Sequence, residues 1–453
     1  MGDSPEYERA IEKGQKRKDS KTGSPVEEDD TLEWSSGTAA RESFAPPGPC
    51  YAGLRNNVST HEMEMQCHKW EDGTEEFVSQ SVIAKYVQDT AVANGILGDV
   101  RLNTRVESVE KQGDEWRIET STLEETALGP QYAHAVHYFD AVVVANGHYH
   151  APNIPDFPGL KDWKQAFPDR IQHSKLYRRP EGFEGQNVLI IGAGVSSTDI
   201  ARELGGVART IYQSSRDGAY DLSSHLLPDN AARVGGVQSF NALPEDLTKT
   251  SNNQDPIPGT IALTNDTQLC NIHHIILATG YHSSLPFLRP YHNDSLTSSQ
   301  ADSRILITDG YQTHNLHKDI FYIPDPTLAF IGIPFHTATF SFFEFQAAAL
   351  AQVLCGKVSL PDQKAMREEY CARLQRKGEG RGFHSMRGEG QEVGYVKELV
   401  EWINGEEEGL MRGHSKKWFE SYARRLERVA LMMGAKRDPE VDRRVLEGQV
   451  PCS

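Results

Sequence analysis

Two glycines stand where an apolar run ends and a helical pattern begins. Residues 188–201 read VLIIGAGVSSTDIA, so Gly192 and Gly194 follow a strand-like run and precede an amphipathic segment. The first glycine permits a turn that a Cβ would hinder, and the second lets a diphosphate approach the main chain. The N–H groups and the dipole of the helix N-terminus favour negative charge there. This spacing predicts a dinucleotide-binding turn.

The residues around the two glycines strengthen this prediction. Ser197 fills the third small position of the motif, where glycine or alanine is commoner, and its hydroxyl is able to bond a phosphate. A GxGxx[GAS] string is weak evidence by itself. Here the strand 187–191, a helix over 196–204 and the strand 210–213 complete a β-α-β unit. A glycine turn in an unrelated α/β fold is the alternative.

The end of the second strand selects between nucleotides. An acidic residue there would bond the ribose 2′-hydroxyl of NAD, but the sequence continues Ser214, Ser215, Arg216. An arginine pairs well with a 2′-phosphate. The sequence therefore favours NADP(H), with Ser215 and Arg216 as contacts. The alternative is an ordinary surface arginine.

The elements that must position this site form an α/β pattern. Val-, Ile- and Ala-rich runs over 139–145, 187–191, 275–277 and 328–333 are typical of strands covered on both faces of a parallel sheet. Shorter strands are expected over 101–109 and 115–120, and helices over 82–92 and 342–354. The remainder of the chain, to Ser453, has a mainly helical pattern.

Composition limits the class of function. The formal charge of −17 disfavours a nucleic acid or an anionic membrane as the main partner. The chain has no CxxC pair and no cysteine in metal-ligand spacing with histidine, which disfavours a dithiol reductase and predicts no metal site. It has no apolar run of membrane-spanning length and no secretory signal. We expect a cytoplasmic protein, and its oligomeric state stays open.

Several phrases in order resemble the flavin-containing monooxygenase family, especially its fungal members. Residues 167–177, FPDRIQHSKLY, are similar to the family's FxGxxxHxxx[YF] motif, with Asp169 in the glycine slot. Residues 51–63, YAGLRNNVSTHEM, resemble its YxxLxTNxPxxxM segment. The similarity runs from about Tyr51 to at least Leu360 and includes the phrases VVVANGHYHAPNIPDFPG, ILATGYHSSLPFL, DPTLAFIGIP and EFQA.

The resemblance implies a fold and a reaction. It implies two Rossmann-like domains with parallel sheets: a first FAD-type part at 48–175, an inserted NADP-binding domain at 176–284, and a return to the FAD-type domain with C-terminal helices at 285–453. Residues 1–47 are expected to be a polar, disordered arm. In the implied reaction, NADPH reduces FAD, the flavin takes up molecular oxygen as a C4a-hydroperoxide, and one oxygen passes to a small substrate with a nucleophilic nitrogen or sulfur. Secondary metabolism would suit a fungal member.

The resemblance also implies roles for individual residues. Asn57 falls on the family's asparagine that reaches both cofactors and supports the oxygenating flavin, and Asn56 in the neighbouring slot competes for this role. The stretch Ser196, Ser197, Thr198 and Asp199 falls on the NADP contacts, and Thr279 and Gly280 on a strand end beside the nucleotide. We expect His173 and Tyr177 to be structural.

One part of the family pattern has no counterpart here. The family opens with a strand and a GxGxxG turn for the FAD diphosphate, but residues 1–50 contain no apolar run before a glycine cluster. The first domain is therefore expected to be N-terminally incomplete. Two alternatives to the monooxygenase remain: a Baeyer–Villiger enzyme, disfavoured because Tyr177 stands where its motif has tryptophan, and an FAD-deficient pseudoenzyme that binds NADP(H).

Overall fold

A computed structural model describes residues 42–126, 129–244, 254–405, 409–434 and 439–447. The chain divides into two units. Unit 1 comprises Met1–Pro47, Asn56–Gly147 and Ser283–Phe419, and unit 2 comprises Gly48–Arg55, His148–His282 and Glu420–Ser453. The division after Gly147 lies well before the expected boundary at 175, because the strands that follow it pair within unit 2.

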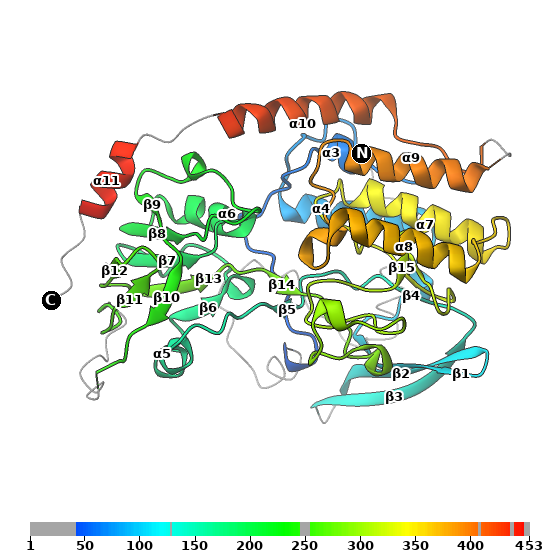
Figure 1. Ribbon diagram of the computed structural model, residues 1–453, viewed down its shortest axis with the longest axis horizontal. Helices are drawn as coiled ribbons and strands as arrows, with labels where there is room; N and C mark the ends of the chain where they lie inside the picture. The colour runs from blue at the N-terminus through cyan, green and yellow to red at the C-terminus, as the bar shows by residue number, and fades with distance from the viewer. Residues whose placement is uncertain (1–41, 127–128, 245–253, 406–408, 435–438, 448–453) are drawn as a thin grey trace, which may run out of the picture. The chain divides into compact units, whose positions relative to one another are not determined.

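Unit 2 is built on five parallel strands (Figure 1). Their order is β6-β13-β7-β8-β9, which places the first strand of the predicted β-α-β unit at the centre of the sheet. The register aligns Leu189 with Ile275 and with Tyr212. The strands are β6 (Ile171–His173), β7 (Asn187–Ile191), β8 (Thr210–Ser214), β9 (Ala231–Val234) and β13 (His274–Leu277).

The two faces of this sheet bury alternate residues of its strands, because successive side chains of a strand point to opposite faces. Val188 and Ile190 pack under helix α6 (Val195–Leu204). Leu189 and Ile191 pack on the other face, where Figure 1 shows helix α5. The elements of that second face are α5 (Leu160–Ala166), β10 (Val237–Phe240), β11 (Ile261–Leu263) and β12 (Gln268–Leu269).

Unit 1 contains a four-stranded sheet of order β15-β16-β17-β4, in which β17 and β4 run parallel. The strands are β4 (Val142–Val144), β15 (Leu316–His317), β16 (Phe321–Tyr322) and β17 (Leu328–Phe330). Helices α7 (Phe340–Leu354) and α9 (Gln391–Asn404) pack against one face. The other face meets an antiparallel sheet of β1 (Thr104–Gln112), β2 (Glu115–Thr126) and β3 (Gly129–Phe139).

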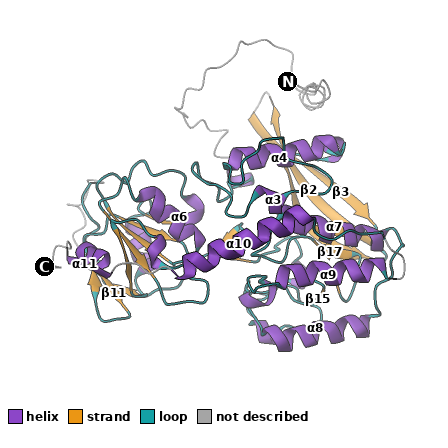
Figure 2. Cartoon of the chain, turned by 90° about the horizontal axis from the view of Figure 1, so that it is seen from above, coloured by secondary structure: helices purple, strands orange, loops and turns teal. Residues whose placement is uncertain are grey.

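The remaining described elements are short or peripheral. Figure 2 shows α7, α8 and α9 gathered around the strands of unit 1. No helix among the described residues is both long enough and apolar enough to cross a bilayer. The elements are α3 (Thr60–Met63), α4 (Gln80–Ala93), β5 (Ala151–Pro152), β14 (Tyr281–His282), α8 (Gln363–Lys377), α10 (Lys416–Gly434), α11 (Pro439–Glu447) and the 3-10 turn η7 (Arg381–His384).

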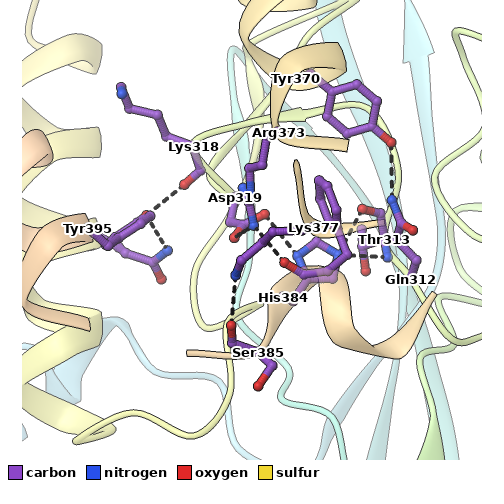
Figure 3. A network of polar contacts seen from close by, with 12 residues as sticks. Gln312, Thr313, Lys318, Asp319, Tyr370, Arg373, Lys377, His384, Ser385 and Tyr395 are labelled. Carbon is purple, nitrogen blue, oxygen red and sulfur yellow. Dashed lines mark hydrogen bonds and ion pairs between the residues drawn. The ribbon is translucent and has the colours of Figure 1, made fainter. Parts of the chain in front are cut away.

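A buried polar network ties α8 and η7 to the sheet of unit 1 (Figure 3). Asp319, fully buried, accepts a hydrogen bond from His384 Nδ1 at 2.9 Å and pairs with Arg373. His384 Nε2 accepts from the Thr313 N–H at 3.1 Å. Burial alone would raise the pKa of Asp319, but the charge of Arg373 and the hydrogen bond from His384 outweigh it and hold that pKa below its usual range.

Three local expectations need correction. The region 101–139 forms three strands rather than two, and Phe139 ends β3 instead of opening the next strand. The predicted burial of 139–145 on both faces is wrong, since Val143 is 43% exposed; in the described residues β4 pairs on one side only, with β17. The expected disordered arm includes Phe44, which is 5% exposed and packs on Tyr132, while residues 1–41 lie outside the described residues.

Candidate nucleotide site

Gly192 joins the carboxyl ends of three strands in unit 2. Its φ of +113° lies in the region that favours glycine, and its N–H donates to the Ser214 carbonyl at 2.9 Å. A Cβ at this position would lie 2.4 Å from the Ala278 carbonyl oxygen. The turn after β7 therefore requires glycine both for its backbone angle and for its approach to the end of β13.

Gly194 opens the helix that follows. It is the N-cap of α6 and supplies no side-chain cap. A Cβ there would have only the Tyr220 carbonyl oxygen nearby, at 4.0 Å, so the space before the helix is open. The N–H groups of the first turn have no partner within the helix, and the Ser196 side chain is exposed beside them. These groups fit a diphosphate.

The next two motif residues face inward. Ser197 is buried, donates its hydroxyl to the Gly192 carbonyl at 2.5 Å, and accepts from Gln213 Nε2 at 2.7 Å. The hydroxyl expected to bond a phosphate is thus engaged within the turn. Thr198 is also buried and lies within 3.4 Å of Gln213 Nε2. Both residues shape the turn rather than face a ligand.

Asp199 also makes contacts inside unit 2. Its carboxylate accepts from the Tyr51 hydroxyl at 3.3 Å, and burial raises the pKa of Asp199 above its usual value. The motif residue Tyr177 donates its hydroxyl to Glu203 at 2.8 Å. His173 Nε2 bonds the Gly280 carbonyl at 3.0 Å. These contacts fit the structural role expected for His173 and Tyr177.

Thr279 and Gly280 lie at the end of β13. The Thr279 hydroxyl donates to the Asn153 carbonyl, and Asn153 N donates to the Gly280 carbonyl at 2.9 Å. Gly280 has a positive φ of 82°. The preceding residue, Ala278, contributes the carbonyl that meets Gly192. The strand end is therefore adjacent to the turn, with the Thr279 hydroxyl committed to the backbone.

The loop after β8 contains the predicted 2′-phosphate contacts. Ser215 is buried and donates to Asp221 Oδ2, which also accepts from the Gly218 N–H at 3.0 Å. Ser215 thus orders the loop. Arg216 is exposed, and its guanidinium makes no hydrogen bond or ion pair with the described part of the chain. It remains available to an anion.

Sequence reasoning missed three residues of this region. Gln213 is fully buried and links Ser197 to Arg233, whose Nε donates to Gln213 Oε1 at 2.8 Å. Asp221 supplies the carboxylate that was not found directly at the strand end. Gln213 lies in the predicted strand 210–213. A polar residue in a strand expected to be buried indicates a buried hydrogen-bond partner, so the sequence did point to this residue. Nothing local marks Arg233 or Asp221.

In unit 1 the structure distinguishes the two neighbouring asparagines. Asn56 Nδ2 donates to the carbonyls of Val58 and Glu76, at 2.7 and 2.8 Å, and its Oδ1 accepts from the Val78 N–H at 2.5 Å. Asn57 is exposed, and its amide makes no hydrogen bond with the described residues. Asn56 therefore anchors the segment, and only Asn57 is free to meet a ligand.

The segment that follows Asn57 packs on the start of α7. The Ser341 hydroxyl, in the first turn of α7, donates to the Glu62 carbonyl at 2.6 Å. Asn57 and the helix start thus belong to one neighbourhood of unit 1. No described strand of unit 1 leads through a glycine turn straight into a helix as β7 does. The described residues accordingly fit a nicotinamide nucleotide in unit 2 but supply no second diphosphate turn for FAD.

The described residues contain no group of three or more histidine, cysteine, aspartate or glutamate side chains placed to hold an ion. Unit 2 offers a glycine turn, a helix N-terminus and the exposed Arg216, and unit 1, by itself, offers the exposed Asn57.

Comparison with known proteins identifies the family of this chain. The model of the flavin-binding monooxygenase-like family matches residues 49–229 and 249–411. The flavin-containing monooxygenase ustF2 of Aspergillus flavus is 45% identical over 386 residues, covering 83% of this chain and 77% of the relative. The flavin-containing monooxygenase iboF of Amanita muscaria is 32% identical, covering 79% of this chain and 71% of the relative.

Solved structures share the fold. An S-allyl-L-cysteine S-oxygenase from Allium sativum matches with a TM-score of 0.63 at 23% identity, covering 88% of this chain and 84% of the other. FAD and NADP(H) are the cofactors of the matched family. The chain therefore belongs to the flavin-binding monooxygenase-like family and is a flavin-dependent monooxygenase.

Proposed function

We propose that this protein uses NADPH to oxygenate a nucleophilic nitrogen or sulfur centre of a small molecule. Relatives with such substrates support the proposal: a thiol-specific monooxygenase of Saccharomyces cerevisiae and a trimethylamine monooxygenase of a Roseovarius species are 28% and 26% identical to it. The two fungal relatives favour a role in secondary metabolism, and we propose a cytoplasmic location.

The observation that carries the proposal is the shape of the turn between β7 and α6. Gly192 allows the end of β7 to lie against Ala278, and Gly194 leaves open space at the N-terminus of α6. A diphosphate bound there would accept hydrogen bonds from the first-turn N–H groups and from the Ser196 hydroxyl. Arg216 would then pair with a 2′-phosphate.

The loop beyond β8 supports NADP(H) over NAD. A carboxylate that reads a ribose 2′-hydroxyl must have a free oxygen directed at it. The Asp221 carboxylate is instead held within its own loop, where Oδ2 accepts from the Ser215 hydroxyl and the Gly218 N–H. The exposed guanidinium of Arg216 makes no hydrogen bond or ion pair with the described residues, and it would pair with a 2′-phosphate through two hydrogen bonds.

In unit 1 we assign Asn57 to the cofactors. An amide can donate to an oxygen and accept from a ring N–H at the same time, and this side chain has no competing partner among the described residues. Flavin, when bound, supplies the activation of oxygen. The residues of this chain contribute binding and orientation, and no step is assigned to an acid or base.

The test is an assay of the purified chain with and without added FAD. NADPH consumption with conversion of a thioether or tertiary amine to its oxide is the expected result. Conversion of a cyclic ketone to a lactone instead would favour a Baeyer–Villiger enzyme. NADP+ binding without NADPH oxidation, even with added FAD, would favour the pseudoenzyme. The pseudoenzyme is tested because the described residues of unit 1 lack a second diphosphate turn.

A further inference from the structure

The side chain of Arg216 lies over a glycine of the next hairpin. Gly236 belongs to the turn between β9 and β10, and a Cβ built on it would be 2.8 Å from Arg216 Cγ. Real Cβ atoms do not approach other heavy atoms so closely. The Ser215 carbonyl and the Thr264 methyl lie farther from the same point, both at 3.5 Å. The missing side chain of Gly236 therefore makes the space through which the stem of Arg216 passes.

The turn that carries Gly236 is fixed from both sides. The Ser214 hydroxyl donates to the Gly235 carbonyl at 2.9 Å and accepts from the Val237 N–H at 3.1 Å. On the other side the Thr264 N–H donates to the Gly236 carbonyl at 2.8 Å. Ser214 ends β8 and Thr264 follows β11, so the turn is tied to both strands. Gly236 thus lies in a fixed place beside the end of β8, the strand that leads to Arg216.

Of Arg216 and Arg233, the two arginines near this turn, Arg216 is the one that can still bind a ligand. Arg233, on β9, donates to the Gln213 side chain and to the Leu222 carbonyl, both at 2.8 Å. The guanidinium of Arg216 has no such partner among the described residues. Its position is therefore set by packing along its stem, and chiefly by the space above Gly236.

We propose that Gly236 is a positioning residue that sets the preference for a nucleotide 2′-phosphate by directing Arg216. This inference rests on the proposed function, since it takes the turn after β7 as the dinucleotide site. With a methyl group at Gly236 the stem of Arg216 must leave the turn, which carries the guanidinium away from the 2′-phosphate. The backbone can stay in place, because Gly236 does not have a positive φ.

The experiment is isothermal titration of the full chain with NADP+ and, separately, with NAD+. Gly236→Ala should weaken NADP+ binding about tenfold, as expected for loss of one charge-assisted pair, and leave NAD+ binding unchanged. Arg216→Ala should give a similar or larger loss for NADP+. Gly206→Ala is the matched control, since Gly206 has open space around its Cβ position and no positive φ.

A double variant separates positioning from a general disturbance. If Gly236 acts through Arg216, adding Gly236→Ala to Arg216→Ala should cause no further loss. An additive loss, or an equal loss for NAD+, would overturn the inference. So would unchanged NADP+ affinity in Gly236→Ala while Arg216→Ala weakens it. If the wild-type chain binds neither nucleotide, the proposed function itself fails.

Discussion

At the scale of single residues, the side chains of the dinucleotide motif serve two different purposes. Ser196 and Arg216 are exposed where a ligand can reach them. Ser197 and Thr198 are buried and connect the turn to Gln213. Neighbouring residues of one motif therefore differ in what their substitution should affect: the exposed ones should change affinity, and the buried ones should change stability.

We expect nucleotide binding to depend strongly on Gly192. Gly192→Ala places a Cβ 2.4 Å from the Ala278 carbonyl oxygen in a backbone conformation with φ of +113°. The left-handed conformation costs a non-glycine residue about 1–2 kcal/mol. Because relief of this strain and of the contact must move the turn that would meet the diphosphate, we expect NADP+ affinity to fall about tenfold or more. Equilibrium titration measures this, with Gly206→Ala as control. Unchanged affinity would remove the basis for the nucleotide site.

The pair Asn56 and Asn57 offers a second test with an internal control. Asn56→Ala removes three hydrogen bonds to the backbone and should lower the free energy of unfolding by about 1–3 kcal/mol. Asn57→Ala removes none within the described residues and should leave stability unchanged while lowering product formed per NADPH consumed. Urea unfolding and a coupled assay read the two effects. Equal destabilisation by both changes would contradict the assignment.

At the scale of elements, the two sheets hold their helices in different ways. In unit 2, α6 packs through Ile200, Ala201 and Leu204 on an apolar strand face. In unit 1, α8 is joined to the sheet through the buried Asp319 network, in which Arg373 of α8 pairs with the carboxylate (Figure 3). The first attachment is apolar, and the second adds a buried charge pair to the apolar contacts of Met366 and Tyr370.

That charge makes unit 1 sensitive to the loss of Asp319. Asp319→Asn leaves Arg373 without its counter-charge in a mostly buried position, which typically costs about 3–5 kcal/mol. Because the pKa of Asp319 is lowered on folding, its contribution is present above the unfolded-state pKa and is lost as pH falls through the folded one. The difference in the free energy of unfolding between wild type and Asp319→Asn should therefore become smaller at pH values below the usual pKa of aspartate.

Urea unfolding at neutral and acid pH checks this prediction. Glu368→Gln is a suitable control on the same helix, because Glu368 forms only an exposed pair with Lys364 at 3.9 Å. Equal stability of Asp319→Asn and Glu368→Gln at neutral pH would show that the network does not hold α8.

At the scale of the whole molecule, buried histidines in both units link stability to pH. Burial lowers the pKa of His173 in unit 2 and of His314 in unit 1 to about 4. The unfolded chain binds protons on these groups at about pH 6.5, so it takes up more protons than the folded chain as pH falls. Stability should therefore decrease as pH falls from about 6.5 towards 4.

The measurement is the free energy of unfolding as a function of pH. His173→Gln should give a shallower decline, because glutamine can still donate to the Gly280 carbonyl and does not titrate. A free energy of unfolding that stays constant between about pH 6.5 and 4, or one that falls equally steeply in His173→Gln, would contradict the role of the buried histidines.

Most of the nucleotide site was predictable because its parts are contiguous. The strand 187–191, the turn at Gly192 and the helix that starts at Val195 follow from one local pattern of apolar residues and glycines. The strand β3 was missed because Gln131 to Ala135 lie on an exposed edge strand, where burial imposes no alternation of apolar residues. The division after Gly147 was also missed, since it depends on strand pairing across the chain.

The sequence by itself determined a glycine turn between a strand and a helix, because the apolar run, Gly192, Gly194 and the amphipathic segment are contiguous. Only the tertiary structure decided which hydroxyls are free, which arginine is uncommitted and which glycine supports it. Those answers depend on contacts such as Gln213 with Arg233 and Arg216 with Gly236, which join separate strands and loops. No local pattern encodes such contacts, since they arise when the sheet assembles.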